Sequence, residues 1–294
     1  MGGINAGAVD ELSLAATVPQ LDAAARSGAP SLIEACRAQR AGVSDPEAPV
    51  FFAPRDGMGA LAQAVHHDAA DRGLHLVRAR ATALDREGTG WRLELDGASP
   101  VLADHVVLTA PAGVCGALVR PHAPKAATLL AGVPYASVAL VALAVARDGV
   151  DRELDGSGYL VPAVEGRTIT ACSWTSAKWA HLAEPDTVWL RASVGRDGDD
   201  RALRLSDADL VAAVLADLEE TMALRAGPEE VRITRLPGSF PQYRPGHLAR
   251  VDAIDADLAA SAPGVVVAGA ALRGLGVPAC IRQAQAAATR VTAR

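Results

Sequence analysis

The sequence has few cysteines, and neither they nor the histidines are arranged as in a metal site or a disulfide framework. The four cysteines form no CxxC pair and lie far apart, at Cys36, Cys115, Cys172 and Cys280. The seven histidines form no HExxH motif. We therefore expect no metal, and a reducing cytoplasm fits such scattered cysteines best.

Long apolar runs and basic stripes are also missing. The longest apolar stretch, 135–146, is about half of the ~20 residues that a bilayer-spanning helix needs, and its valines favour a buried strand. Residues 1–14 have no basic start followed by an apolar core, so no signal peptide is expected. The net charge is −6 with acids and bases interspersed, so nucleic acid is not an expected partner.

Hydrophobic periodicity predicts helices and strands that change in character along the chain. Helices are expected over 13–40 with a break at 28–30, and over 58–71, 207–222 and 279–292. Strands are expected over 74–78, 81–86, 91–95, 105–109, 137–146, 158–162, 168–174, 187–194, 231–236 and 264–269. Turns rather than helices connect the middle strands, which predicts an antiparallel sheet there.

These segments predict an α/β protein with two intertwined domains. Residues 49–112 and 259–294 would form one domain, and an antiparallel-sheet domain over 113–258 would be inserted between them. Residues 1–48 would add a helical lobe to the inserted domain. Some two-domain flavoproteins are assembled from distant chain segments in this way.

The strongest local signal is the glycine-rich turn Gly269–Pro278, which follows an apolar strand and precedes a helix. Free backbone N–H groups and the positive end of the helix dipole gather at such a place. They suit a phosphate or the oxygen-bearing edge of a flavin, and glycines let a flat ligand approach the backbone. On these residues alone, an ordinary strand–helix turn is the favoured interpretation.

Six stretches, in the same order, resemble segments of the oxygen-dependent porphyrinogen oxidases, the FAD enzymes of haem synthesis. The resemblance covers essentially the whole chain, and the order of the stretches makes it specific although each is weak alone. They are Gly3–Leu21, Pro49–Leu61, Val106–Ala112, Gly156–Pro162, Pro241–Val251 and Gly269–Ala288.

The resemblance implies an FAD-binding domain of the amine-oxidase type beside an antiparallel-sheet substrate domain. It also implies a reaction: a porphyrinogen, either coproporphyrinogen III or protoporphyrinogen IX, loses hydrogens to the flavin, and O2 accepts the electrons to give hydrogen peroxide. The cofactor then supplies the difficult chemistry, which agrees with the absence of a Ser–His–Asp set or a pair of acids with a clear role. The identity of any catalytic residue stays open.

Matching positions give candidate site residues. The flavin would contact the backbone of Gly274, Leu275, Gly276 and Val277; the adenine would lie at Ala81; and Thr109, Ala110 and Pro111 would line the dinucleotide groove. The substrate side would include Gly158, Tyr159, Leu160 and Lys178, beside Trp179. A solvated lysine next to a packed tryptophan is the competing interpretation of Lys178. We interpret His247 as a structural histidine rather than a base, and Cys280 as a buried thiol.

The chain departs from the family's pattern at its start and at three internal positions. The family begins with a strand, a G-x-G-x-x-G turn and a helix that bind the pyrophosphate, and this first βαβ unit would lie upstream of Gly3. Asp56, Leu236 and Ala284 stand where a glycine, a tryptophan and a glycine are common. We therefore expect an incomplete FAD domain that binds FAD weakly or not at all on its own.

Two other functions remain open: another amine-oxidase-type flavoprotein, such as a desaturase, and a non-catalytic remnant or interaction module. The choice between the two porphyrinogens is open as well, although a basic pocket would favour the more carboxylated coproporphyrinogen. Peripheral membrane contact through the helical lobe is conceivable, but Ser13–Arg40 is not strongly basic. The sequence does not decide the oligomeric state.

Overall fold

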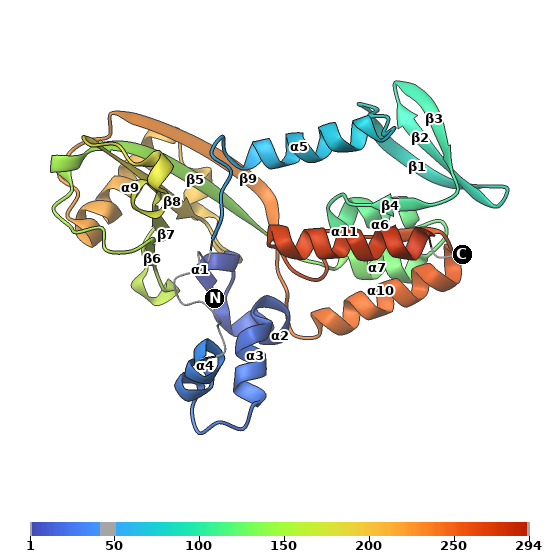
Figure 1. Ribbon diagram of the computed structural model, residues 1–294, viewed down its shortest axis with the longest axis horizontal. Coiled ribbons are helices and arrows are strands. Elements are labelled where there is room, and N and C mark those ends of the chain that lie inside the picture. Colours follow the sequence, from blue (N-terminus) through green and yellow to red (C-terminus); the bar gives the residue numbers. More distant parts are fainter. Residues whose placement is uncertain (1, 42–50, 293–294) are drawn as a thin grey trace. The chain divides into compact units, whose positions relative to one another are not determined.

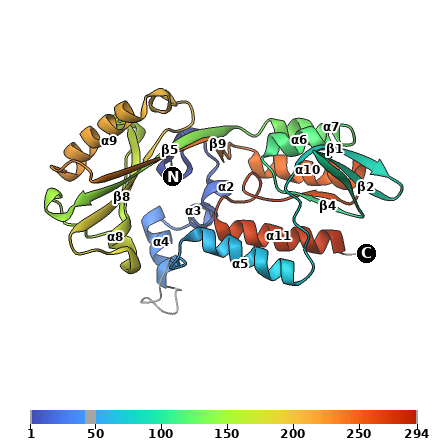
Figure 2. The ribbon, with the colours of Figure 1, turned by 90° about the horizontal axis from the view of Figure 1, so that it is seen from above.

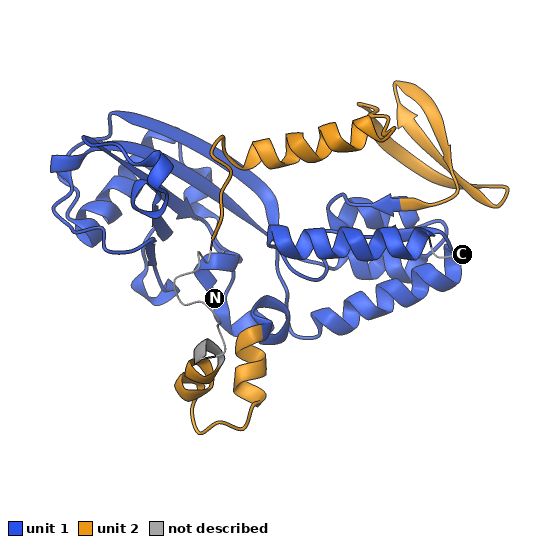
Figure 3. Ribbon diagram, viewed as in Figure 1, with its two compact units in different colours: residues 1–19, 107–294 blue, residues 20–106 orange. Residues whose placement is uncertain are grey.

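The fold is taken from a computed structural model that describes residues 2–41 and 51–292. The contacts divide it into two compact units, residues 1–19 with 107–294 and residues 20–106 (Figure 3). The finer division into four sequence segments stays a prediction. Pro49 and Val50, which begin one of the six resembling stretches, lie outside the described residues.

The unit of residues 20–106 contains helices and one three-stranded antiparallel sheet. Trp91 and Leu84 are its most buried large side chains, and the Arg86 guanidinium lies 4.3 Å from the centre of the Trp91 ring. Its elements are α3 (Pro19–Arg26), α4 (Leu32–Ala41), α5 (Met58–Asp71), β1 (Arg80–Glu87), β2 (Gly90–Asp96) and β3 (Ala98–Ala103). The helices, the break near Gly28 and the β1–β2 hairpin are confirmed.

The strand expected over 74–78 is wrong, because residues 74–79 form no strand. The apolar side chains of Leu74, Leu76 and Val77 are exposed. The pattern looked strand-like, but Leu76 and Val77 are adjacent and therefore break a strict alternation. A segment without a neighbouring strand to hydrogen-bond cannot join a sheet.

The larger unit contains a five-stranded antiparallel sheet in the order β6-β7-β8-β5-β9 (Figure 1). This confirms the antiparallel sheet predicted for the middle of the chain. Its strands are β5 (Tyr135–Ala146), β6 (Gly158–Leu160), β7 (Ile169–Trp174), β8 (Thr187–Val194) and β9 (Glu230–Pro241). The strand β9 is longer than expected because Gly238 lies at an irregularity opposite Ser137, whose hydroxyl accepts a hydrogen bond from Gly238 N–H at 2.9 Å.

Helix α9 (Asp207–Met222) packs its apolar stripe against this sheet (Figure 2). The buried side chains are spaced by one helical turn, at Leu210, Val214, Leu218 and Met222. They join strand residues such as Val141, Ile169 and Leu190 in one hydrophobic core. Ser206 caps the helix by accepting a hydrogen bond from Asp209 N–H.

The rest of the larger unit surrounds a two-stranded sheet of β4 (Val106–Leu108) and β10 (Val265–Val267). Helix α10 (His247–Ser261) contacts both α7 (Pro124–Ala131) and β10, and α11 (Val277–Thr292) contacts β10. Helix α6 (Ala112–Val119) pairs with α7. The shorter helices of this unit are α1 (Gly2–Asn5), α2 (Leu14–Thr17) and α8 (Thr175–Lys178), with 3₁₀ turns at Val9–Glu11, Arg147–Gly149, Ala163–Glu165, Ala180–Leu182 and Arg201–Arg204.

Candidate functional site

The glycine-rich turn that follows β10 has a backbone that only glycine adopts easily at two positions. Gly269 has a φ of +126° and Gly274 a φ of +123°. A Cβ on Gly274 would lie 2.6 Å from the Cβ of Ala279, so a side chain there would displace α11. A Cβ on Gly276 would meet only the Cδ of Pro278, at 3.8 Å. The open space therefore lies beside Gly276.

Tyr243 holds this turn in shape through two hydrogen bonds. Its hydroxyl donates a hydrogen bond to the carbonyl oxygen of Ala270 and accepts one from Gly274 N–H at 3.0 Å. The side chain is 1% exposed, and burial raises the pKa of Tyr243 to about 12. The phenol therefore stays protonated and keeps both bonds throughout the physiological pH range.

His247 supports both the tyrosine and the turn. Its ring stacks on Tyr243 with the centroids 4.2 Å apart, and its Nε2 lies 2.7 Å from the carbonyl oxygen of Leu272. Because a carbonyl only accepts, Nε2 carries the proton in this contact. Burial lowers the pKa of His247, which favours the neutral ring. These contacts agree with the structural role expected for this histidine.

Gln283 connects the turn to α11. Its Oε1 accepts a hydrogen bond from Arg273 N–H at 3.2 Å, and its Nε2 donates to the carbonyl oxygen of Gly274 at 3.4 Å. The Arg273 guanidinium also pairs with Asp252 and Asp255 on α10. The turn and the first residues of α11 are thus held from two sides.

The segment Thr109–Pro111 lies beside the same turn. Ala268 N–H donates to the carbonyl oxygen of Leu108 at 3.0 Å, and a Cβ on Gly269 would lie 3.7 Å from the carbonyl oxygen of Thr109. The three residues are exposed. The structure therefore places Thr109 beside Gly269, at the start of the turn that leads to Gly274, Leu275, Gly276 and Val277, whereas the position of Ala110 and Pro111 at a dinucleotide groove stays a prediction.

A flat ligand with electronegative atoms fits this surface. Gly276 and Val277 are exposed, the first N–H groups of α11 have no partner within the helix, and the helix dipole adds positive potential there. Open space next to a glycine lets a ring system approach the backbone. These features fit a flavin edge. Sequence reasoning assigned no role to Tyr243 or Gln283; the Pro241-Gln242-Tyr243 motif was the available signal for the former.

The remaining cofactor residue, Ala81, is the second residue of β1 in the other unit and is paired with Leu95. Its assignment to the adenine stays a prediction. Cys280 is only partly buried, so the expectation of a buried thiol is wrong. Its sulfur lies 3.9 Å from the carbonyl oxygens of Gly274 and Leu275.

The four residues expected on the substrate side have different environments. Gly158 has a φ of +133°, and a Cβ there would lie 2.2 Å from the carbonyl oxygen of Cys172. Tyr159 points into the core, where its hydroxyl is 2.6 Å from Thr221 Oγ1, and burial raises its pKa. Lys178 ends α8, with its Nζ 5.3 Å from the ring centre of Trp179.

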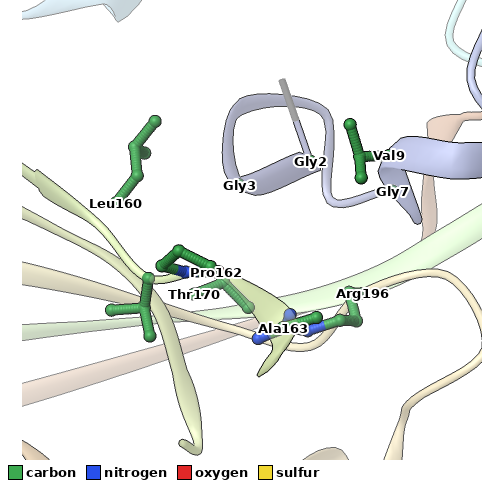
Figure 4. A pocket seen from close by; sticks show the side chains of 10 residues that line it. Gly2, Gly3, Gly7, Val9, Leu160, Pro162, Ala163, Thr170 and Arg196 are labelled. Atoms are coloured by element: carbon green, nitrogen blue, oxygen red, sulfur yellow. The ribbon is translucent and has the colours of Figure 1, made fainter. Parts of the chain in front are cut away.

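Leu160, in contrast, is 48% exposed and lines a cavity of about 300 Å³ (Figure 4). The cavity lies between β6, the following turn and the glycine-rich segment around α1. Its lining residues are Gly2, Gly3, Gly7, Val9, Leu160, Val161, Pro162, Ala163, Thr170 and Arg196. The side chain of Leu160 is therefore at this cavity, as expected for a residue on the substrate side.

The described residues contain no cluster of three or more His, Cys, Asp or Glu side chains that could hold a metal ion. Within the same residues, no helix is both long enough and apolar enough to span a bilayer. All four cysteines are unpaired.

The chain is similar to known proteins over nearly its whole length. The family model described as flavin containing amine oxidoreductase matches residues 1–292. Coproporphyrinogen III oxidase of Bacillus subtilis (strain 168) is 33% identical over 98% of this chain and 61% of its own length. The protein of the same name from Mycobacterium leprae (strain TN) is 35% identical over 97% of this chain and 60% of its own length.

A solved structure assigned as a protoporphyrinogen oxidase, from Exiguobacterium sp. 255-15, superposes with a TM-score of 0.79 at 32% identity. It is matched over 97% of this chain and 60% of its own chain. The chain thus spans about 60% of the length of the curated relatives and of this structure.

Proposed function

The chain belongs to the flavin-containing amine oxidoreductase family, and on that premise we propose that it acts in the FAD-dependent oxidation of a porphyrinogen to a porphyrin in haem synthesis, with O2 as the electron acceptor. Coproporphyrinogen III is the preferred substrate in this proposal, because the curated relatives described above are named coproporphyrinogen III oxidase. Protoporphyrinogen IX is the second.

The observation that carries the proposal is the surface formed by the turn before α11 and Thr109–Pro111. Tyr243, His247 and Gln283 hold the turn, and they leave open space beside Gly276. Gly274, Leu275, Gly276 and Val277 would hold the flavin edge through their backbone, and Thr109, Ala110 and Pro111 would line the adjoining groove. When bound, FAD accepts hydrogen from the substrate and passes electrons to O2.

On the substrate side, Leu160 offers an apolar surface at the cavity and Gly158 keeps the strand β6 close to β7. A packed strand of this kind would orient a substrate more accurately than a loop. Tyr159 would act through its neighbours, since its hydroxyl is bonded to Thr221. Lys178 would interact with an acidic group of the substrate. We also propose a cytoplasmic location, which the unpaired cysteines support.

The test is an oxidation assay of the purified chain with added FAD and coproporphyrinogen III in air. Formation of coproporphyrin, followed by its fluorescence, should exceed the spontaneous rate and depend on both FAD and protein. A Tyr243→Phe variant should be slower, while Tyr159→Phe should retain more of the rate. Porphyrin formation at the spontaneous rate with every porphyrinogen tried would contradict the proposal and favour a non-catalytic module. Oxidation of a different substrate class would favour another flavoprotein activity.

A further inference from the structure

Arg196 brings a positive charge to a cavity that is otherwise mostly apolar. The cavity, of about 300 Å³, has walls of glycine backbone and of apolar side chains such as Val9, Leu160 and Val161. In Figure 4, Arg196 lies near Ala163, and Leu160 lies on the other side of the view. An apolar wall with one cation suits a ligand that is largely apolar and carries an acidic group.

The arginines next to this cavity already have carboxylate partners. Arg244 pairs with Glu11 and Asp197, at 3.1 and 2.9 Å. The Nε and Nη2 atoms of Arg201 donate hydrogen bonds to the two carboxylate oxygens of Asp199, each at 2.8 Å. The guanidinium of Arg167 lies 2.7 Å from the carboxylate of Glu220. The nearby acids are therefore largely neutralised by arginines other than Arg196.

Arg196 differs from them, because its guanidinium forms no ion pair within 4.0 Å and no side-chain hydrogen bond with any residue that the structure describes, although its charge helps Arg201 to lower the pKa of Asp199. It lines the apolar cavity and also the adjoining charged groove that contains Arg167, Arg201 and Arg244. A guanidinium between these two spaces can offer its planar set of N–H donors to an incoming carboxylate.

The backbone around Arg196 is well fixed. Arg196 N–H donates to the carbonyl oxygen of Asp199 at 3.1 Å, and Asp199 N–H donates back to that of Arg196 at 3.0 Å, which closes a tight turn around Gly198. Asp197 N–H donates to the carbonyl oxygen of Ala6 at 2.7 Å. The turn is thus joined to the glycine-rich segment that forms the opposite wall of the cavity.

The glycines of that wall are required by its close packing. A Cβ on Gly7 would lie 2.5 Å from Gln242 Oε1, and a Cβ on Gly3 would lie 3.0 Å from the carbonyl oxygen of Thr170. The Nε2 of Gln242 in turn donates to the carbonyl oxygen of Asn5 at 2.9 Å. Hydrogen bonds and close packing therefore hold the backbone of this wall in place, which preserves the shape of the cavity for a ligand.

We propose that this cavity receives a propionate-bearing edge of the tetrapyrrole and that Arg196 binds the propionate carboxylate. This inference rests on the proposed function and adds a residue that selects the substrate. A whole macrocycle is larger than the cavity, so one edge enters: its apolar part packs against Leu160 and Val161, and its carboxylate meets the guanidinium. Coproporphyrinogen carries more propionates than protoporphyrinogen, so Arg196 favours the former.

The experiment measures binding of the stable oxidised porphyrins, which needs neither FAD nor turnover. Coproporphyrin III, its tetramethyl ester and protoporphyrin IX are titrated separately into the purified chain, and the shift of their visible absorption is followed. The variants are Arg196→Gln, Arg196→Lys and Arg204→Gln. Arg204 is the matched control, since it is an exposed arginine in the same unit that pairs with Asp200 and lines neither the cavity nor the groove.

We expect Arg196→Gln to weaken coproporphyrin binding about tenfold or more, the scale of a lost charge-assisted contact. Arg196→Lys should restore part of it, and Arg204→Gln should change nothing. The tetramethyl ester should bind all four proteins alike, because it offers no carboxylate. The wild type and Arg196→Gln should have similar unfolding curves, since Arg196 has no ion pair to lose.

Two results would overturn the inference. If the wild-type chain binds coproporphyrin and Arg196→Gln binds it equally well, Arg196 is not the carboxylate ligand, while the proposed function stands. If the ester loses as much affinity as the acid in Arg196→Gln, the arginine supports the cavity wall and does not bind a propionate. Absence of any porphyrin binding would contradict both this inference and the substrate part of the proposed function, whereas FAD binding would still be measured separately.

Discussion

Removing the hydroxyl of Tyr243 should loosen the turn that is proposed to hold the flavin edge. In Tyr243→Phe the ring still stacks on His247, so the change isolates the two hydrogen bonds to Ala270 and Gly274. Each bond contributes about 1 kcal/mol, and unpaired backbone groups add to the loss where water cannot reach them. Gly274 is only half-buried. We therefore expect a decrease of about 2 kcal/mol in the free energy of unfolding.

The same variant should respond differently to alkaline pH. The pKa of Tyr243 is raised to about 12, above the value of about 10 for an unfolded chain. The folded state therefore holds this proton more tightly, and the associated stability is fully present below pH 10 and is lost as the pH rises toward 12. Tyr243→Phe should lose less stability than the wild type between pH 9 and about pH 11.

Urea unfolding followed by tryptophan fluorescence measures the first effect, and a titration with FAD measures its consequence for the site. Tyr159→Phe is the matched control: it also loses one buried hydroxyl contact, to Thr221, but in the core under α9. Both variants should be destabilised, and only Tyr243→Phe should bind FAD more weakly. Equal FAD affinities for the two variants, or a stability change in Tyr243→Phe below about 0.5 kcal/mol, would refute this reasoning.

Three further outcomes follow from the structure. Burial lowers the pKa of His247, so the unfolded chain binds more protons than the folded chain below the ordinary histidine value of about 6.5, and stability falls as the pH drops through that range. The variant His247→Gln can keep the contact with Leu272. In urea unfolding, its stability should therefore depend less on pH between pH 8 and 5 than that of the wild type. Ser206→Ala removes the cap of α9 and should cost about 1 kcal/mol in the same assay, and no loss would show that the cap is redundant. Gly158→Ala would place a Cβ 2.2 Å from the carbonyl oxygen of Cys172 and should lower the free energy of unfolding by more than about 2 kcal/mol. Gly166→Ala has open space around it and should lower it by about 1 kcal/mol. Similar losses for the two variants would contradict the close packing of Gly158 against Cys172.

Strong periodicity and clear end signals made part of the fold predictable. The helices Met58–Asp71 and Asp207–Met222 were predicted with the bounds that the structure has, since each combines helical spacing with glycine or serine at its ends. The helix α6 was not predicted, because it is apolar on nearly all sides and contains two glycines. The helix α10 was also missed, although its buried residues His247, Val251, Ile254 and Leu258 follow a helical stripe that could have revealed it.

The candidate site was predictable where one continuous segment builds it and not where distant segments meet. The turn Gly269–Pro278 is a local motif, so its glycines indicated a ligand edge. The family resemblance led us to expect Thr109 at the dinucleotide groove, whereas its place beside Gly269 of this turn comes from the structure. The cavity at Arg196 was not foreseen, because Gly3, Leu160 and Arg196 are far apart in the sequence and each is unremarkable in its own context. The partial exposure of Cys280 likewise depends on where α11 starts.

The central claim, that the turn before α11 holds a flavin edge, is tested most directly by titrating FAD fluorescence with the wild-type chain, Gly276→Val and Gly227→Val. Both glycines tolerate a Cβ in the folded chain, but only Gly276 lies at the proposed flavin surface. We expect weak, saturable FAD binding by the wild type, unchanged affinity in Gly227→Val and about tenfold weaker binding or less in Gly276→Val, where a side chain would occupy the flavin surface. Equal affinities of all three proteins for FAD would contradict the claim.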